Sequence, residues 1–332
     1  MLCINFLLFV VCIAYSEQCF CVPFSVCSLK DISDTEEFNS LKLNMWGFPC
    51  ESDADVCCDV RCGERRLDTQ PFNDNTSYRI FNSHTKANFA EFPWMLAIFY
   101  RNGYRCGGSL IHPQVALTAA HCVDKLGPYK VRAGDWDRYS RNEPLEHEDR
   151  AAAKIIIHGA YDAHSLKNDI ALIIVDKPFP LQENIGVVCL PPENSNPIPK
   201  ECLVTGWGKT SHQSRYSNIL NKATFPMVSH SFCEMALQMA SLGPWFKLDS
   251  TFICAGGEKK DSCKGDGGSP LMCGIADTKN VYEQFGIVSW GLICGTTDAP
   301  GVYVSVAKFV NWIDRQMVLN GFNNSVYKYD RK

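Results

Sequence analysis

Residues 261–270 read Asp-Ser-Cys-Lys-Gly-Asp-Gly-Gly-Ser-Pro, a glycine-rich stretch far along the chain. Two upstream segments accompany it: residues 118–122 read Thr-Ala-Ala-His-Cys and residues 168–172 read Asn-Asp-Ile-Ala-Leu. A histidine, an aspartate and a turn rich in backbone N–H groups are the parts that acyl transfer needs. The imidazole takes a proton from a hydroxyl, the carboxylate holds the imidazole in the right tautomer, and the N–H groups receive the oxyanion.

In this order, the three segments resemble the landmark segments of the trypsin/chymotrypsin-like serine peptidases. The resemblance covers nearly all of residues 80–318 and implies that His121 is the base, Asp169 orients it, and the backbone of Gly265 and Gly267 forms the oxyanion pocket. Gly267, however, stands where the nucleophilic serine should be. Loss of the triad serine costs on the order of 10⁶ in turnover in subtilisin, so the resemblance implies a non-catalytic protein.

Ser269, two positions along, is the alternative nucleophile. Two extended residues displace a side chain by roughly 6 to 7 Å, whereas proton transfer needs about 2.6 to 3.2 Å. Rescue would therefore require a rebuilt loop.

A specificity pocket for Arg or Lys is also implied by the resemblance. Asp261 matches the carboxylate at its base, and Ser289, Gly291 and Gly301 match its walls. Two interpretations are open: the pocket still binds Arg or Lys, or its shape is retained without binding anything.

Active members of the family are cut after a basic residue, which frees an amino-terminal Ile-Val-Gly-Gly. The new N-terminal ammonium group then pairs with the acidic residue just before the catalytic serine. This chain departs from that pattern. Residues 79–82 read Arg-Ile-Phe-Asn, so only the isoleucine fits, although Asp266 is in place to receive the charge. A cut at Arg79 is one possibility. A cut in the preceding region, after one of the basic residues Lys30, Lys42, Arg65 and Arg66, is another.

Length and composition describe a globular, secreted chain. With 332 residues, 46% of them hydrophobic, and a net charge of only -4, it can form one large core and one small module. This charge balance indicates neither nucleic acid nor an anionic membrane as a partner. Residues 1–16 read as a signal peptide whose apolar run is too short for a membrane span.

Of the 18 cysteines, Cys3 and Cys12 would leave with the signal peptide, and the even remainder suits an oxidising compartment. Six cysteines crowd into residues 17–58, a segment too short for a core of its own, so disulfides must stabilise it. Spacing alone leaves their pairing open. The segment resembles the arthropod clip domain, through Cys19-Phe20-Cys21-Val22-Pro23 at one end and Cys57-Cys58 at the other. That resemblance implies the pairs Cys19–Cys57, Cys21–Cys50 and Cys27–Cys58.

Residues 59–79 read as a polar linker, and residues 80–332 as the barrel domain. The two resemblances together imply a linker disulfide, Cys62–Cys189, that would tether the two modules even after a cut between them. Within the barrel domain the implied disulfides are Cys106–Cys122, Cys202–Cys273, Cys233–Cys254 and Cys263–Cys294.

Short apolar runs rich in β-branched and aromatic residues, separated by Gly, Pro and Asn, predict strands of an all-β protein. They span residues 94–100, 115–119, 153–157, 170–175, 203–205 and 285–290. Apolar residues at helical spacing from Val306 to Met317 predict a C-terminal helix. The expected architecture is a trypsin/chymotrypsin-like double β-barrel with that helix, preceded by the clip domain.

Two weaker signals concern ligands and modification. Asp135, Glu146 and Glu148 lie in the stretch that matches the family's calcium-binding loop, where carboxylates suit a hard cation; a solvated acidic loop is the alternative. No cofactor is otherwise required. Asn75 and Asn323 begin glycosylation sequons.

Three functions compete. The chain resembles clip-domain serine protease homologues, which carry this glycine and act in arthropod blood as cofactors for prophenoloxidase activation (melanisation). That implies an innate-immune adaptor in haemolymph, cut by an upstream protease, that binds prophenoloxidase or its activating protease, with oligomerisation after the cut as a further expectation. The alternatives are a recognition or adhesion protein for microbial surfaces, and a trypsin-like protease that uses Ser269.

Overall fold

The computed structural model describes residues 2–6, 9–13, 20–23, 55–58, 61–67, 84–140, 142–197, 200–209, 216–257, 265–292 and 299–331. The chain divides into two compact units, Met1–Arg61 and Cys62–Lys332. The second unit therefore begins inside the predicted linker. Within the described ranges, no helix has both the length and the apolar character that a membrane crossing needs.

The first unit contains two antiparallel strand pairs. β1 (Leu2–Phe6) pairs with β2 (Phe9–Ile13) in the predicted signal peptide, and β3 (Phe20–Pro23) pairs with β4 (Asp55–Cys58) in the predicted clip domain. The register places Cys21 opposite Cys57. Cys19, Cys27 and Cys50 lie outside the described residues, so the three clip disulfides and the signal peptide stay predictions.

Six antiparallel strands of the second unit close into a first barrel in the order β10-β11-β8-β7-β6-β9. Their bounds are β6 (Met95–Tyr100), β7 (Gly103–His112), β8 (Val115–Thr118), β9 (Tyr129–Ala133), β10 (Glu148–Ile157) and β11 (Ala171–Val175). Large apolar side chains such as Leu96, Ile98, Leu110 and Leu172 are buried in this barrel. Their removal from water is the main force that closes it.

A second barrel follows in the order β12-β15-β16-β17-β14-β13, and it closes because β12 also pairs with β13. Its strands are β12 (Glu201–Gly206), β13 (Asn221–Val228), β14 (Phe252–Ala255), β15 (Pro270–Gly274), β16 (Tyr282–Trp290) and β17 (Gly301–Ser305). Phe225, Leu271 and Tyr303 pack in its core. β5 (His84–Lys86) pairs with the first three residues of β13, whereas β14 pairs with the last two.

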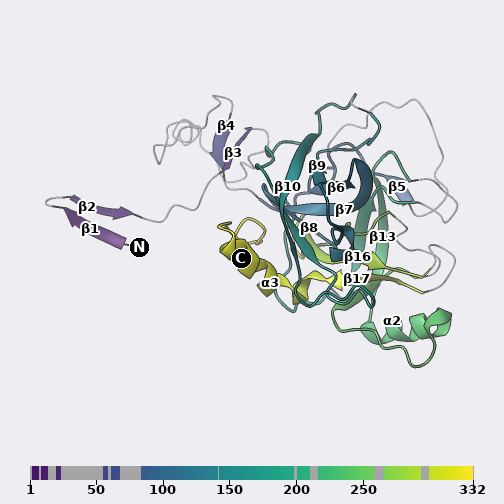
Figure 1. The fold of residues 1–332 in the computed structure, drawn as a ribbon. Helices are drawn as coiled ribbons and strands as arrows, with labels where there is room; N and C mark the ends of the chain where they lie inside the picture. Colours follow the sequence, from purple (N-terminus) through teal and green to yellow (C-terminus); the bar gives the residue numbers. More distant parts are fainter. Residues whose placement is uncertain are drawn as a thin grey trace. The chain divides into compact units, whose positions relative to one another are not determined.

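Helices lie at the periphery of the second unit (Figure 1). The predicted C-terminal helix is confirmed as α3 (Val310–Leu319), after the 3₁₀ turn η3 (Val306–Lys308). A second helix, α2 (His230–Leu237), continues into the π-helical turn η2 (Gln238–Leu242) and was not predicted. Its sequence signal is Ser229, whose side chain caps the helix by accepting the N–H of Phe232.

The double-barrel architecture is confirmed, and each of the six predicted strands falls within or overlaps an observed one. Four disulfides form as expected in the second unit: Cys62–Cys189, Cys106–Cys122, Cys202–Cys273 and Cys233–Cys254. Cys263 and Cys294 lie outside the described residues.

Candidate functional site

His121 and Asp169 meet at one end of the first barrel. His121 sits in the 3₁₀ turn η1 (Ala120–Cys122) that follows β8, and Asp169 precedes β11. The His121 Nδ1 atom lies 2.7 Å from Asp169 Oδ2, and the His121 backbone N–H donates to Asp169 Oδ1 at 2.8 Å. The Asp169 side chain is wholly buried, while that of His121 is 25% exposed. Nδ1 is therefore committed to the carboxylate, and Nε2 is the atom left to accept a proton.

Ser289 from the second barrel completes this relay. It lies on β16, and its hydroxyl donates to Asp169 Oδ2 at 2.6 Å. The hydroxyl of Ser289 thus helps to hold the aspartate, while the predicted place of Ser289 in a specificity pocket stays a prediction. The relay thus joins both barrels and fixes the imidazole as a working triad would.

Gly267 faces the imidazole, and a side chain at this position would require the ring to shift. A Cβ at position 267 would lie 2.7 Å from His121 Nε2 and 3.7 Å from Cys106 Sγ, and real Cβ atoms essentially never approach a neighbour within 3.0 Å. The ring occupies the space that a serine side chain would need. The relay therefore ends at Nε2, and position 267 supplies no hydroxyl to attack a carbonyl.

Ser269 does not replace the missing nucleophile. It is wholly buried, and its hydroxyl has no hydrogen-bond partner among the described residues, His121 included. The Oγ atom instead lies against β7, because a Cβ built on Gly107 would overlap it. This position argues against the relocated-nucleophile alternative.

The oxyanion pocket expected at Gly265 and Gly267 stays a prediction, but the structure shows what surrounds Gly265. Gly265 adopts a φ of 103°, which favours glycine, and its carbonyl accepts the Tyr104 hydroxyl at 2.9 Å. Burial raises the pKa of Tyr104, so the phenol stays protonated and available as a donor. The Tyr216 ring crowds Gly265, because a Cβ there would overlap it.

Asp266, the predicted receiver of a new N-terminal ammonium, accepts the backbone N–H of Gly208 at 2.8 Å. Arg79, Asn75 and the pocket carboxylate Asp261 lie outside the described residues, so cleavage at Arg79, modification at Asn75 and the charge of the pocket stay predictions. Gly291 and Gly301 follow β16 and begin β17, respectively.

The acidic loop between β9 and β10 differs from the predicted calcium set. Only Asp135 of the three expected residues belongs to the observed cluster, which joins it to Glu143 and His147, with ligand atoms within 4.8 Å of one another. Glu148 instead pairs with Arg150 at 2.8 Å, and Glu146 is exposed. The path of the loop, and not the order of the residues in it, decides which acids meet, so the sequence did not indicate Glu143 and His147 as neighbours of Asp135.

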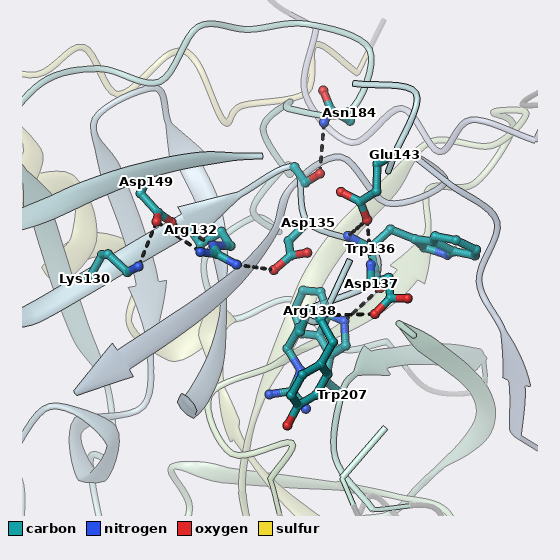
Figure 2. Close-up of polar contacts among 12 residues, drawn as sticks. Lys130, Arg132, Asp135, Trp136, Asp137, Arg138, Glu143, Asp149, Asn184 and Trp207 are labelled. Carbon is teal, nitrogen blue, oxygen red and sulfur yellow. Dashed lines mark hydrogen bonds and ion pairs between the residues drawn. The ribbon is translucent and has the colours of Figure 1, made fainter. Parts of the chain in front are cut away.

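Two carboxylates of this cluster have unused oxygens, as Figure 2 shows. Glu143 Oε1 accepts the backbone N–H groups of Trp136 and Asp137 at 2.9 and 2.6 Å, and Asp135 Oδ2 lies 3.3 Å from Arg132 Nη1. The other oxygens, Asp135 Oδ1 and Glu143 Oε2, are buried without a hydrogen-bond partner among the described residues. Burial raises the pKa of Glu143 to about 7. Buried carboxylate oxygens without a hydrogen-bond partner are suitable ligands for a hard cation.

Residues 62–67 form a strap at the start of the second unit and are fixed to the rest of that unit at several points. Besides the Cys62–Cys189 disulfide, Arg65 Nε donates to Glu91 Oε1 at 2.9 Å, and the Arg65 and Arg66 backbone N–H groups donate to Asn280 and Glu91 carbonyls. Lys222 Nζ donates to both Glu91 oxygens at 2.7 Å, and Glu91 is wholly buried.

These contacts bear on two of the predicted cleavage positions. A protease needs an exposed segment that it can draw into an extended form, whereas Arg65 and Arg66 are hydrogen-bonded and partly buried. The strap therefore argues against cuts at Arg65 and Arg66.

The family model described as Trypsin matches residues 81–313. The chain therefore belongs to the trypsin family. The phenoloxidase-activating factor 2 of Galleria mellonella is 42% identical over 261 residues, which cover 74% of this chain and 86% of that protein.

Two mosquito proteins give the same picture. The inactive CLIP domain-containing serine protease A28 of Anopheles gambiae is 36% identical over 256 residues, covering 75% of this chain and 67% of that protein. The inactive CLIP domain-containing serine protease A8 of the same species is 37% identical over 249 residues, covering 71% and 68%. Together these relatives show a clip-domain serine protease homologue.

Proposed function

We propose that this chain is a secreted, non-catalytic cofactor that promotes prophenoloxidase activation in arthropod haemolymph. The observation that carries the proposal is the intact His121, Asp169 and Ser289 relay beside a glycine whose side-chain space the imidazole fills. Relatives named as a phenoloxidase-activating factor and as inactive proteases support both parts of it.

The loss of peptidase activity follows from the size of the contribution that a triad serine makes to turnover. Removal of a triad serine costs on the order of 10⁶ in turnover, or roughly 8 kcal/mol of barrier, which binding and oxyanion contacts do not recover. Ser269 is buried and has no hydrogen bond to His121, so its hydroxyl does not substitute for the missing one. What the fold retains is a rigid surface that can bind other proteins.

We further propose that an upstream protease cuts the chain, and that the cut form binds prophenoloxidase, its activating clip-domain protease, or both. The hydrogen bonds of the strap disfavour cleavage after Arg65 and Arg66. A cut after the strap, for example at Arg79, would leave the N-terminal fragment joined to the barrels through Cys62–Cys189. Both modules would then act as one particle.

The proposal includes a calcium ion at the acidic loop, held by Asp135 and Glu143. The two buried, unused carboxylate oxygens support it, since a divalent cation would neutralise them. Added calcium should raise the melting temperature of the protein by a few degrees, and Glu143→Gln should remove most of that rise. An equal rise in the variant would exclude this site.

Reconstitution tests the adaptor function. Cut and uncut protein are added separately to a defined mixture of prophenoloxidase and its activating protease, and phenoloxidase activity is measured. We expect the cut form to increase activity several-fold and the uncut form to have little effect. No increase with cut protein would refute the cofactor function.

A matched variant separates an adaptor from an enzyme. His121→Ala removes the base of the relay, so a protein that acts without catalysis should retain its full cofactor effect. If the effect disappears in this variant while the melting temperature is unchanged, the chain is acting as an enzyme.

A further inference from the structure

Arg138, in the loop between β9 and β10, forms no ion pair with the carboxylates that the structure describes. Its guanidinium donates from Nη2 to the Ser217 carbonyl at 2.8 Å, and its Nε atom is buried without a hydrogen-bond partner among the described residues. By contrast, the guanidinium groups of Arg132 and Arg150 each lie 2.8 Å from a carboxylate oxygen. A half-buried cation gains much from a counter-charge, and the described part of the chain does not supply one to Arg138.

Tyrosine rings surround the cation. The central carbon of the Arg138 guanidinium lies 4.2 Å from the centre of the Tyr104 ring and 5.6 Å from the centre of the Tyr139 ring. The Tyr104 ring lies in turn 6.4 Å from the ring of Tyr216. Tyr139 and Tyr216 are 76% and 42% exposed. The ring faces attract the cation but do not cancel its charge. We call Arg138, Tyr104, Tyr139 and Tyr216 the Arg138 site.

The backbone around Arg138 is held in place. The Arg138 N–H donates to the Asn218 carbonyl at 3.1 Å, and Asp137 pairs with Ile219 in an antiparallel bridge. The Asp137 carboxylate accepts the Tyr139 N–H at 3.1 Å, so the acid next to Arg138 in sequence is bonded to the backbone. A ligand therefore meets residues whose backbone is already fixed, which lowers the entropy lost on binding.

The Arg138 site adjoins the turn that carries Gly267. The Tyr104 hydroxyl donates to the Gly265 carbonyl at 2.9 Å, and a Cβ on Gly265 would overlap the Tyr216 ring. The Lys209 ammonium lies 6.0 Å from the centre of the Tyr216 ring and adds a second positive charge. Two cations among exposed aromatic rings favour a ligand that combines negative charge with apolar surface.

We propose that the Arg138 site binds an acidic segment of a partner protein. An Asp or Glu carboxylate of that segment would meet the Arg138 guanidinium, and its neighbouring side chains would pack on the rings of Tyr139 and Tyr216. The carboxylate supplies the counter-charge through hydrogen bonds that are stronger than those between neutral groups. The exposed rings favour a peptide over a small anion, which would leave them in water.

The residue types of the site fit this interpretation. Arginine and tyrosine are enriched among the residues that contribute most to binding at protein interfaces. Arginine also presents its donors in a planar fork that matches a carboxylate. The proposal concerns binding alone and does not depend on the cofactor function.

Fluorescence anisotropy of a labelled hexaglutamate peptide tests the site in the full-length secreted protein. The natural protein should bind this peptide more tightly than a labelled hexaglutamine peptide, and added salt should weaken the binding. Arg138→Gln should weaken the dissociation constant at least about tenfold, the size expected for loss of a charge-assisted hydrogen bond. Arg315→Gln is the matched control, because it removes the same charge from an exposed position on α3 and should change the affinity less than about twofold.

Two further variants separate charge from shape. Arg138→Lys keeps the charge but loses the planar fork, so it should recover only part of the affinity that Arg138→Gln loses. Tyr139→Ala removes an exposed ring and should weaken binding a few-fold at an unchanged melting temperature. It therefore tests the site even where Arg138→Gln lowers the melting temperature.

Three results would overturn the proposal. One is equal binding of hexaglutamate and hexaglutamine, and another is equal affinity of Arg138→Gln and Arg315→Gln for hexaglutamate. The third combines two observations: sodium sulfate displaces the peptide while sodium chloride of the same ionic strength does not, and Tyr139→Ala binds as tightly as the natural protein. That result would assign the site to a small inorganic anion.

Discussion

Asp169 in the relay and Glu91 beneath the strap are both wholly buried carboxylates that accept several hydrogen bonds. The donors differ. Asp169 is held by a backbone N–H, an imidazole and a hydroxyl, whereas Glu91 is held by two cationic side chains, Arg65 and Lys222, and one backbone N–H.

This difference separates two reasons for keeping a buried charge. The relay orients His121 for a reaction that lacks its nucleophile, so its geometry persists as part of the packing between the barrels. The network of Glu91 joins three stretches that are distant in sequence: the strap, the loop after β5, and β13. Substitutions in the relay should therefore cost little free energy of unfolding and should not restore peptidase activity. Substitutions in the network of Glu91 should cost much more free energy of unfolding.

Gly267→Ser tests whether the relay can be restarted, and it should fail. The new Cβ would require His121 to move, so most of the loss of about 10⁶ in turnover should remain. Turnover of an arginyl amide substrate and fluorophosphonate labelling provide the measurements. Gly267→Ala, which adds the same crowding without a hydroxyl, is the control. Robust turnover or stoichiometric labelling of the serine variant would show that the site is still adapted to catalysis.

Glu91→Gln should produce the largest loss of stability. It leaves Arg65 and Lys222 partly buried without a counter-charge, which typically costs about 3 to 5 kcal/mol in the free energy of unfolding. Asp169→Asn keeps one acceptor oxygen but turns the other into a donor, so at least one neutral donor loses its acceptor, and the change should cost about 1 to 3 kcal/mol. Urea unfolding midpoints of the two variants give the comparison. Equal losses would mean that the two carboxylates are held in the same way.

Acid should reproduce the Glu91→Gln effect in the natural protein. Burial opposes ionisation of Glu91, but hydrogen bonds from Lys222, Asn88 and Arg65 outweigh it and hold its pKa below the ordinary value of 4.5. The stability that this group contributes is therefore complete above that value and is lost as the pH falls through the lowered pKa. Melting curves should show the natural protein approaching Glu91→Gln as the pH falls below 4.5. A constant difference at all pH values would contradict this.

The resemblance to the trypsin-like family gave the double barrel, the relay pair and four of the disulfides, because the family's landmark segments are short and can be matched in the sequence. His121 stands next to a disulfide cysteine, and Asp169 directly precedes an apolar strand. The role of Ser289 was missed because its neighbours indicated a pocket, while its partner Asp169 lies 120 positions away.

The remaining features depend on how loops fold back on the barrels. Glu143 joins Asp135 only because its carboxylate reaches the backbone of Trp136 and Asp137. Likewise, Arg65 read as a linker residue open to cleavage, and nothing near it in sequence indicated Glu91 as its partner. Pairings of this kind require three-dimensional contacts that spacing does not encode.

Ser269→Ala should have the smallest effect, and its sign is informative. The hydroxyl is buried and lacks a hydrogen-bond partner among the described residues, so its removal relieves an unsatisfied polar group. Stability should stay the same or rise by about 1 kcal/mol, with no change in cofactor activity or in fluorophosphonate labelling. Ser289→Ala is the matched control, since it removes a hydroxyl that is bonded to Asp169 and should reduce stability by a similar amount. If the natural protein were labelled and Ser269→Ala abolished that labelling, the nucleophile would have moved to this position, and the relay would no longer be a site without chemistry.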